Sequence, residues 1–423
     1  MIKRRIRELL LVCSAGLVAA SVMGVVAIGS VGAVTTNWTP SQDVLSPPPA
    51  SSTTLLAVSC ESFGNCTAVG QDASGPMVIT EHNGAWGQPT DLTATSGGYL
   101  QALSCPDQQN CVAVGYVYDS GYHPVWAQEA GGVWSQVTEV SSEDAYLSSV
   151  SCWSAGNRAF GGNGTGLSSS AIYTFSAGTM ATPPTTLTDP AANSFIRSIS
   201  CVSSSECTVV GADDNGWATA NLSGSGWSAL GNPAGAPAGG ELYSVACPSS
   251  GHCTAVGLSG SGTLNWLSGS GSSWGAPGQV ASSNGGSPSI SCADASNCQV
   301  VVGNPYTHSD TFGEVNGIWD TAVTPFSNSD PIILSSVSCA TDQSCTAVGT
   351  LDQNPQVPIF ATYPVNFVPP TTTTAPTTTT TAAKAQLANT GLMYLPLSGL
   401  VVGFVGVGIS LTLLARRRTE GAE

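Results

Sequence analysis

Seven units of the chain repeat one alternation of apolar and polar positions. In each unit a short apolar run ends in Ser-Cys or Ala-Cys, five residues intervene, and a second apolar run ends in Gly. The first unit contains "AVSCESFGNCTAVG" and the last contains "SVSCATDQSCTAVG". Apolar runs of this length, bounded by Ser, Asn and Gly, predict short β-strands. A helical repeat would need amphipathic stretches of about ten residues or more, and the units contain none.

The spacing of these units predicts the fold. Successive units lie 45 to 49 residues apart, as measured between their first cysteines. These are Cys60, Cys105, Cys152, Cys201, Cys247, Cys292 and Cys339. A period in the forties, made of short strands, is typical of propeller blades. The sequence therefore predicts an all-β fold, a seven-bladed β-propeller over residues 34–366.

Each unit is expected to supply four strands. The third is a short apolar segment such as "MVITEH", and the fourth begins at a Gly-x-Trp and continues for about eight residues. The fourth-strand tryptophans are Trp86, Trp134, Trp227, Trp274 and Trp319, and the third unit has Met180 instead. Small residues recur one and three positions before the first cysteine, as at Ser59 and Ala57. We expect them to relieve crowding where the innermost strands approach the axis.

The seventh unit lacks a fourth-strand sequence, and the N-terminal region contains one that belongs to no unit. Residues 37–45, "NWTPSQDVL", match "AWGQPTDLT" of the first unit. We therefore expect residues 34–46 to form the closing strand of the last blade. Closure in this way removes an unpaired sheet edge and the gap between the first and last blades.

The two ends of the chain carry targeting patterns. Four basic residues, an apolar run and small residues around Ala33 predict a secretory signal peptide over residues 1–33, with an uncleaved membrane anchor as the alternative. Residues 367–386 form a predicted Pro/Thr-rich stalk. Residues 392–415 are apolar and predict a single transmembrane helix, and the basic residues 416–423 predict a cytoplasmic tail.

A short motif precedes the predicted transmembrane helix. The segment "LANTG" comprises Leu387, Ala388, Asn389, Thr390 and Gly391. Together with the apolar span and the arginines, it resembles a sortase cell-wall sorting signal of the Leu-Ala-x-Thr-Gly type found in actinobacteria. The resemblance implies that a sortase cuts between Thr390 and Gly391 and joins the chain to cell-wall peptidoglycan. The alternative is a permanent transmembrane anchor. Either arrangement implies a cell-surface location with the propeller outside the membrane.

Charge excludes one class of partner. From Val34 to Thr390 the chain has three basic residues and 23 acidic residues, a formal charge of 3 − 23 = −20. Binding to phosphates requires clustered Lys and Arg, so nucleic acid is excluded as a partner.

Twelve cysteines form C-x5-C pairs. In an exported chain this spacing predicts disulfides, because zinc ligands are usually two to four residues apart. The predicted bridges are Cys60–Cys66, Cys105–Cys111, Cys201–Cys207, Cys247–Cys253, Cys292–Cys298 and Cys339–Cys345. Cys152 is left unpaired, since Arg158 occupies the partner position. A free thiol, a redox sensor, an intermolecular bridge and a buried inert cysteine all remain open for it.

The segment from "AVG" to "ITEHNGAWG" resembles the repeats of bacterial neuraminidases, or Asp-box repeats, and those of plant and cyanobacterial photosystem-assembly propellers. The Gly and Trp of that motif are present, as at Gly84 and Trp86, but the aspartate is absent. Sialidases hold the substrate carboxylate with three arginines, whereas the predicted propeller has only Arg158 and Arg197. The resemblance implies the fold, and sialidase activity is not expected.

No constellation of catalytic or metal-binding residues is evident. The four histidines lie in different repeats without metal-ligand spacing, so neither a metal nor a cofactor is predicted. Tyr116, Tyr118 and Tyr122, in "GYVYDSGYHPVW", are candidate ligand contacts, because a tyrosine presents an apolar face and a polar tip. The alternation of a plain hairpin would also account for them.

Two functional classes remain open for the exported propeller. The first, which we favour, is a binding or adhesion module for a glycan or a protein. The second is a surface glycan hydrolase or lyase that uses carboxylates on one face of the propeller.

Overall fold

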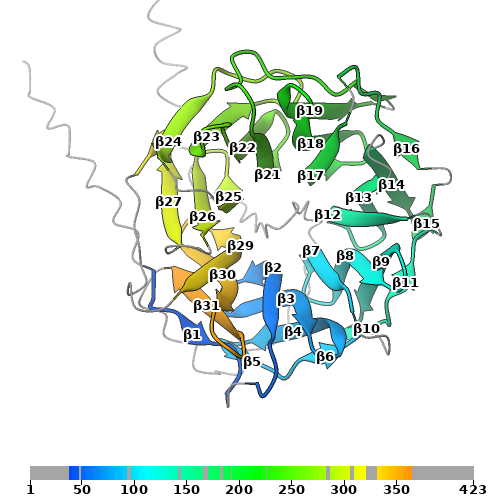
Figure 1. The fold of residues 1–423 in the computed structure, drawn as a ribbon, viewed down its shortest axis with the longest axis vertical. Helices are drawn as coiled ribbons and strands as arrows, with labels where there is room; N and C mark the ends of the chain where they lie inside the picture. The colour runs from blue at the N-terminus through cyan, green and yellow to red at the C-terminus, as the bar shows by residue number, and fades with distance from the viewer. Residues whose placement is uncertain are drawn as a thin grey trace, which may run out of the picture. The chain divides into compact units, whose positions relative to one another are not determined.

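The computed structural model describes residues 38–46, 49–92, 97–141, 144–164, 170–181, 184–191, 193–224, 226–282, 286–304, 309–320 and 331–363. All of them belong to one compact unit, Thr36–Glu423. They form seven antiparallel sheets of four or five strands, arranged as a ring (Figure 1). The prediction of an all-β, seven-bladed propeller is confirmed.

The first three blades each contain five strands. They are β2 (Thr54–Ser62), β3 (Asn65–Asp72), β4 (Gly75–His82), β5 (Ala85–Trp86) and β6 (Thr90–Asp91) in blade 1; β7 (Tyr99–Asp107), β8 (Asn110–Tyr118), β9 (Tyr122–Ala130), β10 (Val133–Trp134) and β11 (Thr138–Glu139) in blade 2; and β12 (Ala145–Ser154), β13 (Asn157–Gly164), β14 (Ser170–Ser176), β15 (Thr179–Met180) and β16 (Thr185–Thr186) in blade 3.

The last four blades each contain four strands. They are β17 (Phe195–Ser203), β18 (Glu206–Asp213), β19 (Gly216–Ser223) and β20 (Gly226–Trp227) in blade 4; β21 (Glu241–Ser249), β22 (His252–Leu258), β23 (Thr263–Gly269) and β24 (Gly278–Ser282) in blade 5; β25 (Ser287–Asp294), β26 (Asn297–Gly303), β27 (Asp310–Val315) and β28 (Ile318–Trp319) in blade 6; and β29 (Ile332–Thr341), β30 (Ser344–Leu351), β31 (Val357–Tyr363) and β1 (Gln42–Asp43) in blade 7.

The apolar core lies between neighbouring blades. One cluster, for example, joins Val69 and Leu92 of blade 1 to Leu100, Leu103 and Ala113 of blade 2, all of them fully buried. Successive side chains of a strand point to opposite faces of the sheet, so each sheet has apolar residues available for both neighbours. Stacking of the blades around the ring therefore buries both faces of every sheet.

A ring of serine hydroxyls links the innermost strands. The serine before the first cysteine of one blade accepts a hydrogen bond from the backbone N–H of the first cysteine in the next blade. The bond from Cys105 to Ser59 is 3.2 Å long and the bond from Cys60 to Ser338 is 2.9 Å long. Four further pairs repeat the contact: Cys152 with Ser104, Cys201 with Ser151, Cys247 with Ser200, and Cys339 with Ser291. Blade 5 has Ala246 at this position, which cannot accept such a bond. The recurrent serines therefore do more than relieve crowding near the axis, because their hydroxyls also form hydrogen bonds between neighbouring blades.

The N-terminal segment closes the ring. In blade 7, β1 pairs antiparallel with β31, with Gln42 opposite Phe360 (Figure 1, dark blue beside orange). The Thr39 N–H donates to the Thr362 carbonyl at 2.8 Å, and the Val44 N–H donates to the Pro358 carbonyl at 3.0 Å. The Trp38 side chain is 5% exposed and joins the apolar cluster between blades 6 and 7. The fragment before the first repeat therefore occupies the outer position of the last blade.

The fourth strands are shorter than the eight residues expected from the sequence. In blade 1, β5 and β6 each contain two residues and are separated by residues 87–89. In other blades the residue after the tryptophan uses its side chain as an acceptor in the ladder. The Gln128 N–H donates to Ser135 Oγ at 3.1 Å, and the Gly313 N–H donates to Asp320 Oδ1 at 2.7 Å. In these blades a side-chain oxygen takes the place of a backbone carbonyl in the ladder. In blade 1, where Gly87 follows the tryptophan, β5 is equally short without such a bond.

Six disulfides join the first two strands of every blade except blade 3. The Cα atoms of each pair lie 3.9 to 4.0 Å apart, and the pairs are those predicted from the C-x5-C spacing. Disulfides of this number indicate an oxidising, extracellular environment.

In blade 3 Cys152 is a free, buried thiol. Burial raises the pKa of Cys152 to about 12, so the thiol stays protonated and unreactive. Arg158 is its cross-strand partner, and the guanidinium lies 4.6 Å from the ring centroids of both Trp126 and Phe175. A stacked cation therefore occupies the place of the missing bridge.

The predicted signal peptide, stalk, sorting motif, transmembrane helix and cytoplasmic tail lie outside the described residues. Within the part of the chain that the structure describes, no helix is long and apolar enough to cross a membrane.

Candidate functional site

The three candidate tyrosines lie on one hairpin of blade 2. Tyr116 and Tyr118 belong to β8, Tyr122 begins β9, and Tyr118 is the cross-strand partner of Tyr122. Residues two apart on a strand share a face, so Tyr116 and Tyr118 point to the same side. The Tyr122 N–H donates to Asp144 Oδ1 at 2.8 Å, which ties the hairpin to the segment that enters blade 3.

Two more tyrosines, which sequence reasoning did not select, complete this group. Tyr99 begins β7 and Tyr146 lies near the start of β12. Both stand six residues before the first cysteine of their units, a signal in the repeat alignment that could have identified them. The ring centroid of Tyr116 lies 5.5 Å from that of Tyr99, 5.0 Å from that of Tyr122 and 6.4 Å from that of Tyr146. The centroids of Tyr118 and Tyr122 are 5.3 Å apart. We call these five residues the tyrosine cluster.

The tyrosine cluster is uncharged and partly open to solvent. Tyr118 is 55% exposed and Tyr122 is 38% exposed, whereas the other three are less exposed. Burial and the neighbouring phenols raise the pKa of Tyr116, so its hydroxyl stays protonated. Among the described residues, none of the five hydroxyls has a hydrogen-bond partner. The cluster therefore combines aromatic faces with phenolic hydroxyls, and two of its residues are open to solvent.

A pocket of about 230 Å³ adjoins the cluster at Tyr146. Its lining includes Asn163, Phe195 and Arg197 from blades 3 and 4. Arg197 lies with its guanidinium 4.7 Å from the Phe195 ring centroid, and Arg197 Nε donates to Glu241 Oε2 at 2.9 Å. The single arginine of this pocket is therefore neutralised by a carboxylate, and the hollow beside the tyrosine cluster is polar without a strong net charge.

Three buried carboxyl groups lie at equivalent places in the outer part of blades 1, 2 and 6. Glu81, Glu129 and Glu314 each pair across the sheet with the fourth-strand tryptophan. Burial raises the pKa of Glu81 and of Glu129 to about 7, and it also raises the pKa of Glu314. These carboxyls belong to third strands rather than to the innermost strands. They are therefore distributed around the ring instead of forming one opposed pair.

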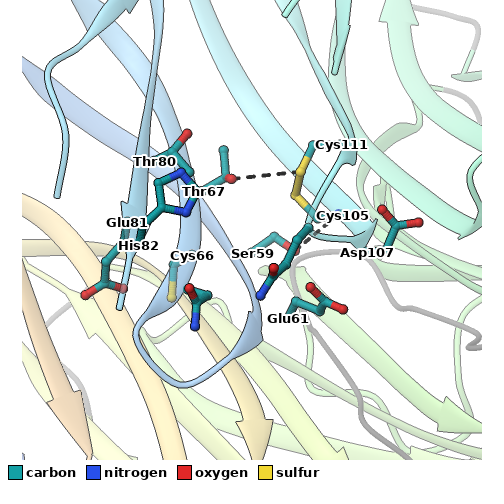
Figure 2. A pocket seen from close by; sticks show the side chains of 12 residues that line it. Ser59, Glu61, Cys66, Thr67, Thr80, Glu81, His82, Cys105, Asp107 and Cys111 are labelled. Atoms are coloured by element: carbon teal, nitrogen blue, oxygen red, sulfur yellow. Dashed lines mark hydrogen bonds between the residues drawn. A yellow bond between two sulfur atoms is a disulfide. The ribbon is translucent and has the colours of Figure 1, made fainter. Parts of the chain in front are cut away.

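A small cavity lies between blades 1 and 2, next to the Cys105–Cys111 disulfide (Figure 2). Its volume of about 10 Å³ suits at most one water molecule. Figure 2 shows Glu61 and Asp107 beside it, whereas the Glu81 carboxyl points away from the disulfide. Within the described ranges, no group of three or more His, Cys, Asp or Glu residues could hold a metal ion.

Comparison with known proteins gives the fold. No family model matches the chain, and no curated protein matches it. Among solved structures, it is similar to YCF48 bound to D1 peptide, with a TM-score of 0.53 and 14% identity over 79% of this chain and 97% of the other. It is also similar to YCF48 from Cyanidioschyzon merolae, with a TM-score of 0.50 and 13% identity over 78% of this chain and 100% of the other.

A more distant likeness is to AofleA from Arthrobotrys oligospora, with a TM-score of 0.45 and 16% identity over 68% of this chain and 95% of the other. At these identities the two YCF48 structures support the fold class alone. The chain is a seven-bladed β-propeller of the disulfide-stapled kind described above.

Proposed function

We propose that this protein is an exported, surface-anchored binding module that presents the tyrosine cluster to a neutral glycan. The observation that carries the proposal is the cluster itself. Five phenols from two blades lie side by side, and two of them are open to solvent.

The chemistry of the cluster favours a carbohydrate. A sugar ring has apolar C–H faces that stack on aromatic rings and hydroxyls that exchange hydrogen bonds with phenols. The five tyrosines carry no charge, and the neighbouring Arg197 is paired with Glu241. A neutral glycan therefore loses less solvation on binding here than a charged ligand would.

The anchoring part of the proposal depends on the ends of the chain. The sorting motif Leu387–Gly391, followed by the apolar span 392–415, supports attachment to cell-wall peptidoglycan by a sortase. The stalk 367–386 would then hold the propeller away from the membrane.

The test is a glycan and cell-wall array probed with the full-length protein and with a Tyr118→Ala/Tyr122→Ala double variant. Each lost aromatic contact is worth about 1 kcal/mol, so we expect binding to weaken about tenfold or more. Tyr118→Phe/Tyr122→Phe keeps the rings and should retain most of the affinity. Ile318→Ala is the matched control, because Ile318 is also an exposed apolar residue but belongs to blade 6.

Two results would contradict the proposal. One is glycan binding by the alanine double variant that equals that of the unchanged protein. The other is selective capture of peptides rather than glycans by the tyrosine cluster, which would replace the glycan with a protein ligand. Thermal unfolding of each variant separates lost contacts from lost folding.

A further inference from the structure

A second hollow, larger than the pocket beside the tyrosine cluster, lies between blades 1 and 2. Its volume is about 530 Å³. Blade 1 contributes Val78, Thr80 and His82 from β4, and blade 2 contributes Glu129 from β9 and Trp134 from β10. We call it the blade 1–2 groove.

One residue of blade 1 that lines the groove is smaller than its equivalent in blade 7. Val78 stands opposite Val69, the residue before the repeat glycine. The equivalent residue of blade 7 is Phe360, opposite Val348, and its ring lies 5.8 Å from that of Trp86 in blade 1. An aromatic residue at this position thus fills the space in front of the next blade's tryptophan. Valine leaves that space open in front of Trp134.

The lining of the groove includes a carboxyl group with one oxygen that has no hydrogen bond among the described residues. Glu129 is 7% exposed, and its buried Oε2 atom has no hydrogen bond among the described residues. A buried carboxyl with an unmade hydrogen bond is costly, and a ligand that supplies a donor recovers that cost. Burial and nearby Asp107 raise the pKa of Glu129 to about 7.

The other lining residues indicate which donor fits. Glu129 is the only acidic residue of the lining, and the lining contains no Lys or Arg. Trp134 offers an aromatic surface for a cation, and Val133, 71% exposed, offers an apolar surface for a methylene chain. A carboxyl, an indole and an apolar edge together suit a long cationic side chain.

The charge of the domain favours the same kind of partner. Over residues 34–366 the chain has two basic residues and 23 acidic residues, a formal charge of 2 − 23 = −21. A field of this sign attracts basic protein surfaces and speeds their association.

We propose that the blade 1–2 groove binds a lysine or arginine side chain of a basic protein segment, with Glu129 as its ion-pair partner. This site is separate from the tyrosine cluster, and it does not depend on the glycan-binding function proposed above.

The test uses two blocked peptides, acetyl-Gly-Gly-Lys-Gly-Gly-amide and its Gln counterpart, labelled for fluorescence anisotropy with the full-length protein. We expect the Lys peptide to bind more tightly than the Gln peptide. Glu129→Gln should weaken the Lys peptide about tenfold, since a charge-assisted bond is worth about 1.5 kcal/mol or more. Val78→Phe, which places the blade 7 residue in blade 1, should block the groove and have a similar effect.

Glu81→Gln is the matched control, because Glu81 occupies the equivalent position of blade 1 and does not line the groove. Its affinity for the Lys peptide should match that of the unchanged protein. Equal binding of the Lys and Gln peptides would overturn the proposal, as would full affinity in Glu129→Gln. An equal loss of affinity for the Lys peptide in Glu81→Gln would also overturn the proposal, because the overall charge of the protein would then account for binding. If Val78→Phe fails to fold, Glu129→Gln decides alone.

Discussion

At the scale of single residues, the buried glutamates couple stability to pH. Glu81 is 2% exposed, and burial raises its pKa from 4.5 to about 7. A carboxyl whose pKa is raised on folding favours the folded state below its unfolded pKa. This contribution is lost as the pH rises through the folded pKa. The free energy of unfolding should therefore fall between about pH 4.5 and pH 8.

The variant Glu81→Gln isolates this contribution. Glutamine does not ionise, so the variant should be more stable than the unchanged protein at pH 8, by up to roughly 3 kcal/mol, and differ little at pH 5. Thermal unfolding at both pH values measures the difference. A stability difference between the two proteins that stays the same at pH 5 and pH 8 would show that Glu81 does not titrate as described.

At the scale of elements, the closing strand decides whether the ring is complete. Deletion of residues 36–45 removes Trp38, Val44 and Leu45, all at most 6% exposed, together with the pairing of β1 and β31. Each large apolar side chain is worth about 1.5–3 kcal/mol when buried, so the loss should be on the order of 5 kcal/mol. We expect a clear fall in Tm, measured by circular dichroism or calorimetry.

Deletion of residues 371–380, within the predicted stalk, is the control and should leave Tm unchanged. A deletion of residues 36–45 that is equally harmless would mean that the last blade is stable with three strands and that the segment is dispensable for closure.

At the scale of the whole molecule, the sorting motif predicts both the C-terminal residue of the mature chain and its attachment to the cell wall. If a sortase processes it, mass spectrometry of the cell-wall fraction should find Thr390 as the last residue, joined to a peptidoglycan amine. Thr390→Ala should shift the protein from the wall fraction to the membrane fraction. An intact C-terminus in the unchanged protein, still including residues 392–423, would instead indicate a permanent anchor.

Much of the fold could be predicted from the sequence, because the length and spacing of the repeats reflect the blades that they form. The spacing of Cys60, Cys105 and their equivalents predicted the number of blades. The segment "NWTPSQDVL", which precedes the first repeat, predicted the closing strand. The glycine of the second strand also follows from backbone geometry. At Gly70, a Cβ would overlap the Thr54 carbonyl beside the irregularity between Leu55 and Ala57. The repeat spacing and the extra N-terminal segment are periodic properties that a sequence displays directly, whereas the overlap at Gly70 is visible only in the structure.

The candidate site was only partly accessible. Tyr116, Tyr118 and Tyr122 are close in sequence, so their proximity could be expected. Tyr99 comes from β7 and meets Tyr116 as its cross-strand partner within blade 2. Tyr146 comes from β12 of blade 3 and joins the group only when blades 2 and 3 stack side by side. The fourth strands are shorter than the sequence predicted, and they are two residues long both where a side-chain acceptor such as Ser135 follows the tryptophan and where Gly87 does.

The sequence by itself determined the fold class, the six disulfide pairs and the position of the closing strand, because each depends on spacing that repeats along the chain. Only the tertiary structure decided what lies between blades. It brought Tyr146 of blade 3 to the tyrosines of blade 2, and it left Glu129 Oε2 without a hydrogen bond among the described residues. It also placed the recurrent serines where they accept hydrogen bonds from the next blade. The physical reason is that neighbouring blades are joined by side-chain packing. The fit of each interface depends on pairs of residues about one repeat apart, and no single repeat specifies such a pair.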